Sequence, residues 1–366
     1  MSSVFDNLID QEAVINTLKD AITASKDSSN NSQNMTHSWL FTGPPGSGRS
    51  NAAIAFAAAL LCEQGGCSTC VNCITTIDGS HADIELVRTE GLSIKVDEAR
   101  ELITRTSWSP SVGNYRVVVI EDADRLTESA ANALLKVIEE PGARTVWLLC
   151  APTLTDVIPT IRSRCRHLTL RTPSIKAVTQ LLIERDGIDP KMADFAANAA
   201  QGHIGRAKYY ATDSKARDNR EEILNLSKSI SNLSSALKAA GDLMELAKSS
   251  AKNEMESKNL EELSQIRSIT GLADNKRISG ANRIVKEIEK KQDDALKRYA
   301  NDLLQNACQE LITYKVNDFI QSMQSGKLAN VKESDYKSLI SNNKEIFDSK
   351  VINILQLERF LISNFL

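Results

Sequence analysis

Apolar residues follow two kinds of spacing along the first 170 residues. Short apolar runs bounded by turn-forming residues predict buried strands; they lie at 38–42, 83–87, 116–120, 146–150 and 167–170. Helical spacing predicts intervening helices, which fall at 51–62, 96–107 and 128–140, after a first amphipathic helix that carries Val14, Ile15, Leu18, Ala21 and Ile22. Strands alternating with helices indicate an α/β fold whose parallel sheet is covered on both faces.

The pattern changes after Thr172 and Pro173, where only helical spacing remains. Three short helices are predicted up to residue 213, and further helices from 214 to the end. We therefore divide the chain into an α/β domain over 1–170, a small helical domain over 171–213 and an all-α domain over 214–366. The charged stretch 249–296 is more simply explained as a solvated helix face than as an interaction tail, and the apolar end, 351–366, is expected to be packed.

The composition is typical of a globular protein and argues against a nucleic-acid-coating or membrane-spanning chain. The chain has 366 residues, of which 42% are hydrophobic and 25% charged, as in ordinary globular proteins of two or three domains. A net charge of −3 argues against a chain that coats nucleic acid by itself. We find no apolar run long enough for a membrane span and no signal peptide, so we expect a cytoplasmic protein.

Residues 43–50, GPPGSGRS, have the spacing of the phosphate-binding loop pattern GxxxxGK[ST], between a predicted strand and a predicted helix. Glycines allow backbone N–H groups to close on phosphate oxygens at the positive end of that helix. The Ser50 hydroxyl stands at the position of a Mg²⁺ ligand. A Gly/Pro-rich turn is the simpler alternative. The candidate nucleotide-binding residues are Gly43, Gly46, Gly48, Arg49 and Ser50.

Two departures argue against ATP hydrolysis by this chain and leave nucleotide binding open. The lysine of the pattern is replaced by Arg49, whose planar guanidinium is larger than an ammonium group. Glu121 and Asp122 follow the predicted strand 116–120, where paired acids suit Mg²⁺ coordination and water activation. Their order is the reverse of the usual Asp-Glu, and misplacements of about 1 Å can abolish catalysis. A polar cap on a buried strand is the plainer interpretation.

Four of the seven cysteines form a close-set cluster. They have the pattern C-x4-C-x2-C-x2-C, which lets four thiolates reach one tetrahedral Zn²⁺. Because four sulfur ligands leave no open position, we expect a structural zinc ion; an iron–sulfur cluster and four free thiols are the alternatives. A leaderless chain suggests a reducing compartment, where close-set cysteines bind metal more often than they cross-link. The ligands would be Cys62, Cys67, Cys70 and Cys73.

Two arginines occupy positions of interest. Arg164 lies between the helix-like segment TDVIPTIR and the predicted strand 167–170, at an edge from which a guanidinium could enter a neighbour's nucleotide site. Arg206 lies in the small helical domain and could reach this chain's own phosphates. Surface ion pairs are the plainer interpretation of both side chains when each is considered alone.

Together and in this order, these features resemble the clamp-loader branch of the AAA+ proteins, and within it the delta-prime subunits of bacterial DNA polymerase III. The resemblance rests on four segments, which are VFDNLIDQEAV, GPPGSGRS with the cysteine cluster, VVVIEDADRLTESAANALLKVIEEP and TIRSRCR. It is specific over residues 1–213 and weak beyond them. It implies an AAA+ P-loop domain with an inserted zinc module at 62–73, a lid at 171–213 and a collar at 214–366.

The resemblance also implies a function. The chain would be one subunit of a hetero-pentamer with gamma/tau and delta subunits, which loads the sliding clamp onto primed DNA as part of the polymerase holoenzyme at the replisome. Arg164 would resemble the arginine finger that serves the adjacent motor subunit's ATP site, and the zinc would be structural. Arg49 agrees with the frequent loss of a competent ATP site in delta-prime subunits, and the usual polar sensor is missing near Ala151.

Two other functions stay open. A gamma/tau-type subunit would bind and hydrolyse ATP itself, and it should carry lysine at the position of Arg49. A zinc-ribbon DNA-binding protein with a vestigial ATPase fold should show a basic face, against which the acidic balance argues.

Overall fold

A computed structural model of the chain describes residues 3–26, 35–89, 93–229, 238–252, 255, 290, 292–304, 306–308 and 311. The chain divides into two compact units, residues 1–213 and residues 214–366. Each unit is described by itself, and most of the account concerns the first, which contains every candidate site residue.

The first unit contains a five-stranded sheet in the order β2-β3-β4-β1-β5. Every pairing in it is parallel, with Leu40 opposite both Leu149 and His167. The predicted α/β fold with a parallel sheet is therefore confirmed, and all five predicted strands are present within one or two residues. The strands are β1 (Ser38–Thr42), β2 (Ile84–Val87), β3 (Arg116–Ile120), β4 (Thr145–Ala151) and β5 (Arg166–Thr169).

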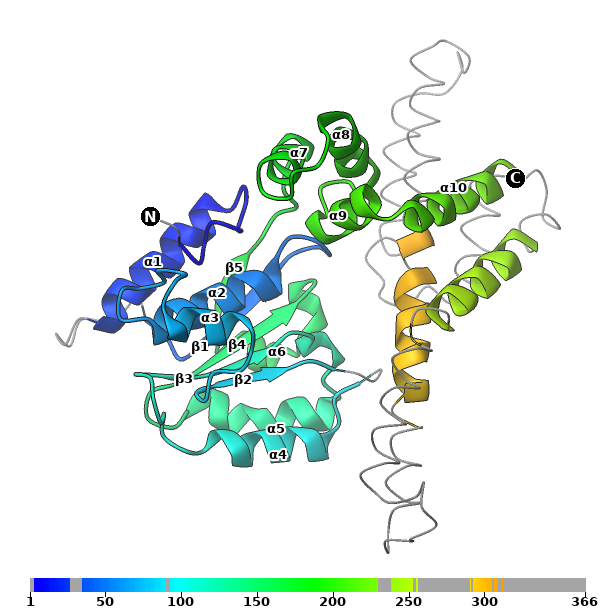
Figure 1. The fold of residues 1–366 in the computed structure, drawn as a ribbon. Coiled ribbons are helices and arrows are strands. Elements are labelled where there is room, and N and C mark those ends of the chain that lie inside the picture. The colour runs from blue at the N-terminus through cyan, green and yellow to red at the C-terminus, as the bar shows by residue number, and fades with distance from the viewer. Residues whose placement is uncertain are drawn as a thin grey trace, which may run out of the picture. The chain divides into compact units, whose positions relative to one another are not determined.

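Helices cover both faces of this sheet (Figure 1). One face packs against α1 (Glu12–Lys26), α2 (Arg49–Leu61) and α3 (Val71–Ile77), and the other packs against α4 (Val96–Thr106) and α5 (Glu128–Glu139). Successive side chains of a strand point to opposite faces. In β4, Leu148 accordingly joins the first core and Trp147 the second. Burial on both faces explains why the strands are near-continuous apolar runs.

Helix α2 is the most deeply buried of these helices. Every residue from Ala52 to Leu61 is buried, which is typical of a helix that is apolar all round and lies inside a domain. It begins at Arg49, directly after the candidate phosphate loop, and ends beside Cys62. The packing of α2 therefore fixes the positions of both candidate sites.

Three helices follow the sheet, namely α7 (Ile175–Glu184), α8 (Pro190–Ala199) and α9 (Ile204–Thr212). The segment that leads to them is tied to the N-terminal residues. Gln11 Nε2 donates to the Arg171 carbonyl at 2.5 Å, and the Ser174 N–H donates to Asp10 Oδ2 at 2.7 Å. These bonds hold the first of the three helices against the chain's beginning.

Some short elements are absent from the sequence-based prediction. Helix α3 lies inside the cysteine cluster, which the sequence indicates as a loop. Its seven residues are too few for a periodic pattern to be recognised. Two further short helices connect the strands; they are η1 (Ala123–Arg125) and η2 (Leu154–Asp156). The segment TDVIPTIR, which the sequence indicates as helix-like, contains helix α6 (Pro159–Arg162).

The second unit is helical wherever it is described. Helix α10 spans Ser214–Ser229, and a helical stretch at 238–252 buries Ala239, Ala240 and Leu243. The predicted apolar packing of 351–366 and most of the charged stretch 249–296 lie outside the described residues. Within the described part of the chain, no helix combines the length and apolarity needed to cross a bilayer.

A buried carboxylate fixes the loop between α4 and β3. Asp83 is 0% exposed, and its two oxygens accept hydrogen bonds from the N–H of Ser111 at 2.6 Å, Val112 at 2.7 Å and Gly113 at 2.6 Å, and from Ser111 Oγ at 2.8 Å. Burial alone would raise the pKa of Asp83, but the backbone donors outweigh burial and lower the pKa to about 2. The folded structure thus stabilises the ionised form of Asp83 relative to the protonated form.

We expect Asp83→Asn to lower the free energy of unfolding at pH 7 by about 2 kcal/mol, because an amide nitrogen would face backbone N–H donors. Since the folded-state pKa lies below the unfolded value, this contribution is present above about pH 4 and is lost as pH falls toward 2. Denaturant unfolding across that range measures it. Asp20→Asn, on the exposed face of α1, is the matched control, and equal effects of the two variants would contradict the prediction.

Candidate functional site

The candidate phosphate loop lies at the carboxyl edge of the sheet. It follows β1, and the Gly43 N–H donates at 3.1 Å to the carbonyl of Pro152, which follows β4. Glu121 and Asp122 follow β3, the next strand along. Parallel strands bring their carboxyl ends to one edge, where ligands commonly bind. The structure therefore brings the predicted loop and the predicted acids to the same edge.

The loop backbone requires glycine at two positions. Gly46 has φ 86° and Gly48 has φ 85°, in the left-handed region that side chains disfavour. Gly46 is also approached closely by the third of the following helices. A Cβ added there would lie 2.5 Å from Cγ of His203, the residue at the start of α9. His203 therefore lies directly on the loop, and nothing in the sequence pattern indicated this contact.

Arg49 bends back along the loop. Its Nη1 donates to the Gly43 carbonyl at 2.6 Å, so the guanidinium joins the first and seventh residues of the motif. Burial lowers the pKa of Arg49, and nearby acidic groups, among them Asp122 and Asp124, partly oppose that effect. Arginine stays charged throughout the physiological range. The positive charge of the motif is present, but it is turned toward the loop's own carbonyl.

The acids at the end of β3 pair with arginines. Glu121 Oε1 accepts from Arg88 Nε at 3.0 Å, and Asp122 lies 4.0 Å from Arg125 Nε. These contacts fit the plainer interpretation of the acids as a polar cap as well as they fit metal coordination. Ser50 is half-buried in the first turn of α2, one residue after Arg49.

Arg206 lies beside His203. Its backbone N–H donates to His203 Nδ1 at 3.3 Å, so the imidazole caps α9. Burial, and to a lesser extent the charges of Arg206 and Arg49, lower the pKa of His203 to about 4. The ring is accordingly neutral at pH 7. Arg206 thus lies in the first turn of the helix whose N-cap contacts the phosphate loop; that its side chain reaches this chain's own phosphates stays a prediction.

Arg164 lies at the opposite edge of the sheet. It precedes β5, whose first residue, Arg166, pairs with Trp39 near the start of β1. It is therefore at the amino ends of the strands, whereas the phosphate loop is at their carboxyl ends. Its Nε forms an ion pair with Glu139, the last residue of α5, and its Nη1 donates to the Thr160 carbonyl at 2.8 Å. No pattern in the sequence indicated that Glu139 would pair with this arginine.

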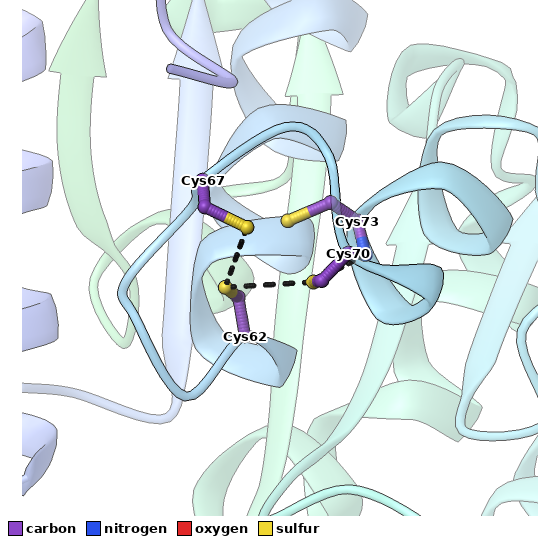
Figure 2. Close-up of side chains that lie close together, drawn as sticks. All are labelled: Cys62, Cys67, Cys70 and Cys73. Atoms are coloured by element: carbon purple, nitrogen blue, oxygen red, sulfur yellow. Dashed lines mark hydrogen bonds between the residues drawn. The ribbon is translucent and has the colours of Figure 1, made fainter. Parts of the chain in front are cut away.

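The four clustered cysteines come together between α2 and α3, with their sulfur atoms facing one another (Figure 2). Cys62 ends α2, and Cys70 begins α3 by accepting the Cys73 N–H at 3.4 Å. Left-handed Gly65 and Gly66, with φ of 78° and 105°, allow the chain to turn back between the first two cysteines. The two helix ends therefore position the sulfurs of Cys62, Cys70 and Cys73, and the turn between them positions that of Cys67.

The sulfur positions fit a tetrahedral metal ion. All four Sγ atoms lie within 4.8 Å of one another, and Cys62 Sγ is 3.7 Å from the Sγ atoms of both Cys67 and Cys70. Four thiolates at about 2.3 Å from one zinc ion would be separated by about 3.8 Å. A disulfide requires about 2.05 Å. The cluster could therefore hold one metal ion such as zinc.

The thiols differ in acidity. The backbone N–H groups of Thr69 and Cys70 lower the pKa of Cys67 to about 6, whereas burial raises the pKa of Cys73. Thiolate is the form that binds metal. Cys67 is thus mostly a thiolate at pH 7, the form that binds metal, whereas Cys73 has to lose its proton when a metal binds.

Similarity to known proteins agrees with the sequence motifs. Residues 18–174 match the family model for DNA polymerase III, delta subunit. Over 195 residues, the chain is 32% identical to DNA polymerase III subunit delta′ of Bacillus subtilis, which covers 52% of this chain and 59% of that protein. The resemblance to delta-prime subunits is confirmed. The delta′ subunit of Pseudomonas aeruginosa is 35% identical over 152 residues, covering 40% of this chain and 46% of its own length.

Gamma/tau subunits also match. That of Mycobacterium tuberculosis is 30% identical over 192 residues, covering 50% of this chain and 32% of its own length. The matched region thus spans about half the length of the delta-prime relatives and less of the gamma/tau relatives. Among solved structures, a gamma subunit-related protein from Thermotoga maritima aligns over 97% of this chain and 99% of its own at 18% identity, with a TM-score of 0.43.

We expect the purified chain to carry one metal ion, and Cys67→Ser and Cys73→Ser to lose it, because three thiolates leave the tetrahedron open. Elemental analysis of protein prepared without chelator measures the content. Cys165→Ser, which changes a thiol outside the cluster, should keep the full equivalent. Less than about half an equivalent per wild-type chain would contradict the prediction.

Proposed function

We propose that this chain is a delta-prime-type subunit of the clamp loader of a bacterial DNA polymerase III holoenzyme. The observation that carries the proposal is the match of residues 18–174 to the delta-subunit family. The chain would help to load the sliding clamp onto primed DNA by supplying Arg164 to the ATP site of a neighbouring motor subunit. It would be a component of a DNA-directed DNA polymerase without ATPase activity of its own.

The placement of Arg164 supports a role in a neighbour's site. The residue lies at the edge of the sheet opposite this chain's own phosphate loop, so it is badly placed to act there. Its side chain is 37% exposed, and its guanidinium is held by Glu139 and the Thr160 carbonyl rather than buried. An arginine supplied from one subunit to another stabilises the charge that develops on a transferring phosphoryl group.

The remaining assignments follow from the same proposal. The partners are gamma/tau and delta subunits in a hetero-pentamer, with the sliding clamp and primed DNA reached through the complex, in the cytoplasm at the replisome. Residues 171–213 act as the lid and residues 214–366 as the collar that joins subunits. The metal is zinc, and it is structural, because the four thiolates leave no position for water or substrate.

A gamma/tau-type subunit that hydrolyses ATP itself is the second candidate, favoured by the 30% identity to gamma/tau subunits. Two contacts disfavour it. Arg49 is turned toward the Gly43 carbonyl, and Glu121 is paired with Arg88. A motor site needs a cation that reaches the terminal phosphates and an acid that is available to Mg²⁺ or water.

We expect Arg164→Ala to lower the clamp- and DNA-dependent ATPase of the assembled loader severalfold, because one motor site would lose its arginine finger. Size-exclusion chromatography should show intact assembly, and steady-state phosphate release measures the effect. Arg162→Ala, which removes a positive charge two residues away, is the matched control. Unchanged ATPase in the assembled Arg164→Ala loader would remove this assignment.

We expect the isolated chain to release no phosphate from MgATP at ordinary enzyme rates, that is, about 1 per second or faster. The gamma/tau subunit of the same organism, assayed alone, is the positive control. Turnover by the isolated chain at the rate of that control would exclude the delta-prime-type role and favour the second candidate.

A further inference from the structure

The ring of His203 covers the middle of the phosphate loop. A Cβ placed on Gly46 would lie 2.5 Å from Cγ, 2.7 Å from Cδ2 and 2.8 Å from Cβ of His203. No side chain fits between the glycine and the imidazole. A phosphate-binding loop uses glycines so that phosphate oxygens can approach its backbone closely. Here an imidazole of the same chain occupies the approach to Gly46.

The position of His203 is fixed from two sides. Its Nδ1 accepts the backbone N–H of Arg206 at 3.3 Å, which makes the side chain the N-cap of α9. The preceding Gly202 packs so tightly on the connection from the sheet that a Cβ there would lie 2.3 Å from the Pro173 carbonyl oxygen. The ring is therefore held on the loop by the helix that it caps and by the residue before it.

The Arg49 side chain bridges the two ends of the phosphate loop. Its Nη1 bond of 2.6 Å to the Gly43 carbonyl draws the guanidinium along the loop instead of beyond it. The Ser47 side chain of the same loop is buried beside Gly43, and its hydroxyl has no hydrogen-bond partner among the described residues. Because the pKa of His203 is lowered to about 4, the ring is neutral at pH 7, so the positive charges of Arg49 and Arg206 do not repel it from this position.

We propose that His203 and Arg49 are the residues that determine the ligand specificity of this loop, and that together they exclude nucleoside triphosphate from it. His203 denies phosphate the backbone at Gly46, and Arg49 occupies the interior with its own guanidinium. The proposal rests on the proposed function in that it takes residues 43–50 as a degenerate P-loop. It adds a physical cause of the loss, located in the helical segment as well as in the motif.

Binding of MgATP to the full-length chain tests this proposal by isothermal titration calorimetry. The variants are His203→Ser, Arg49→Lys and the double variant. Serine is chosen because its hydroxyl can cap α9 in place of the imidazole, and lysine because it restores the motif. The matched control combines His37→Ser with Arg185→Lys, at exposed positions away from the loop.

We expect the wild type and the control to show no saturable binding up to about 1 mM MgATP, the upper end of ordinary enzyme affinities. The double variant should bind with a dissociation constant at least about tenfold lower than that limit, and each single variant should fall between. Thermal melting and metal content identify variants that have not folded; for such a variant, His203→Asn, which also caps the helix, replaces the serine.

Two results would overturn the proposal. One is wild-type binding as tight as that of the double variant, and the other is a folded double variant that binds no MgATP. Neither result bears on whether Arg164 serves a neighbouring subunit, because that is measured in the assembled loader. Failure of this proposal and failure of the proposed function are therefore distinguishable.

Discussion

The parallel register of the five strands decides what each candidate residue can reach. Because β1 pairs in parallel with both β4 and β5, the residues after β1, β3 and β4 gather at one edge of the sheet and those before β5 at the other. Gly43 and Glu121 thus lie at the same edge of the sheet, while Arg164 is separated from them by the length of the strands. The burial of both faces stabilises this arrangement, since shifting a strand by one residue would move each of its side chains into the opposite core, where the packing does not fit it.

Helix α2 links the two candidate centres. Its first residue, Arg49, belongs to the phosphate loop, and the residue after its end, Cys62, is a candidate metal ligand. A helix of this length spans about 20 Å. The cysteine cluster is therefore too remote to take part in phosphate chemistry, but it lies at the far end of the helix on which the loop is built. The Val4 N–H donates to the Gly66 carbonyl at 3.1 Å, which attaches the N-terminal segment to the turn of the cysteine cluster.

The sequence predicted the parts of this protein that depend on local pattern. Apolar runs such as RVVVI identified the strands, and the spacing of Cys67, Cys70 and Cys73 predicted that their sulfurs converge. It did not predict contacts that depend on distant segments meeting. His203 on Gly46 joins residues far apart in sequence, and Asp83 finds its donors in a loop beyond α4. The sequence placed Gly46 in the candidate phosphate loop and Asp83 at the start of a predicted strand, but it did not indicate the distant residues that contact them.

The ion pair between Arg164 and Glu139 is exposed, with side chains 37% and 43% accessible. At physiological salt the Debye length is about 8 Å, and exposed pairs of this kind contribute between about 0 and 1 kcal/mol. The ion pair is thus only slightly more stable than the two side chains separated and hydrated in salt solution. A multiply charged anion on another molecule could replace Glu139 as the partner of Arg164 at little cost in free energy. The ion pair with Glu139 weakens as the ionic strength rises.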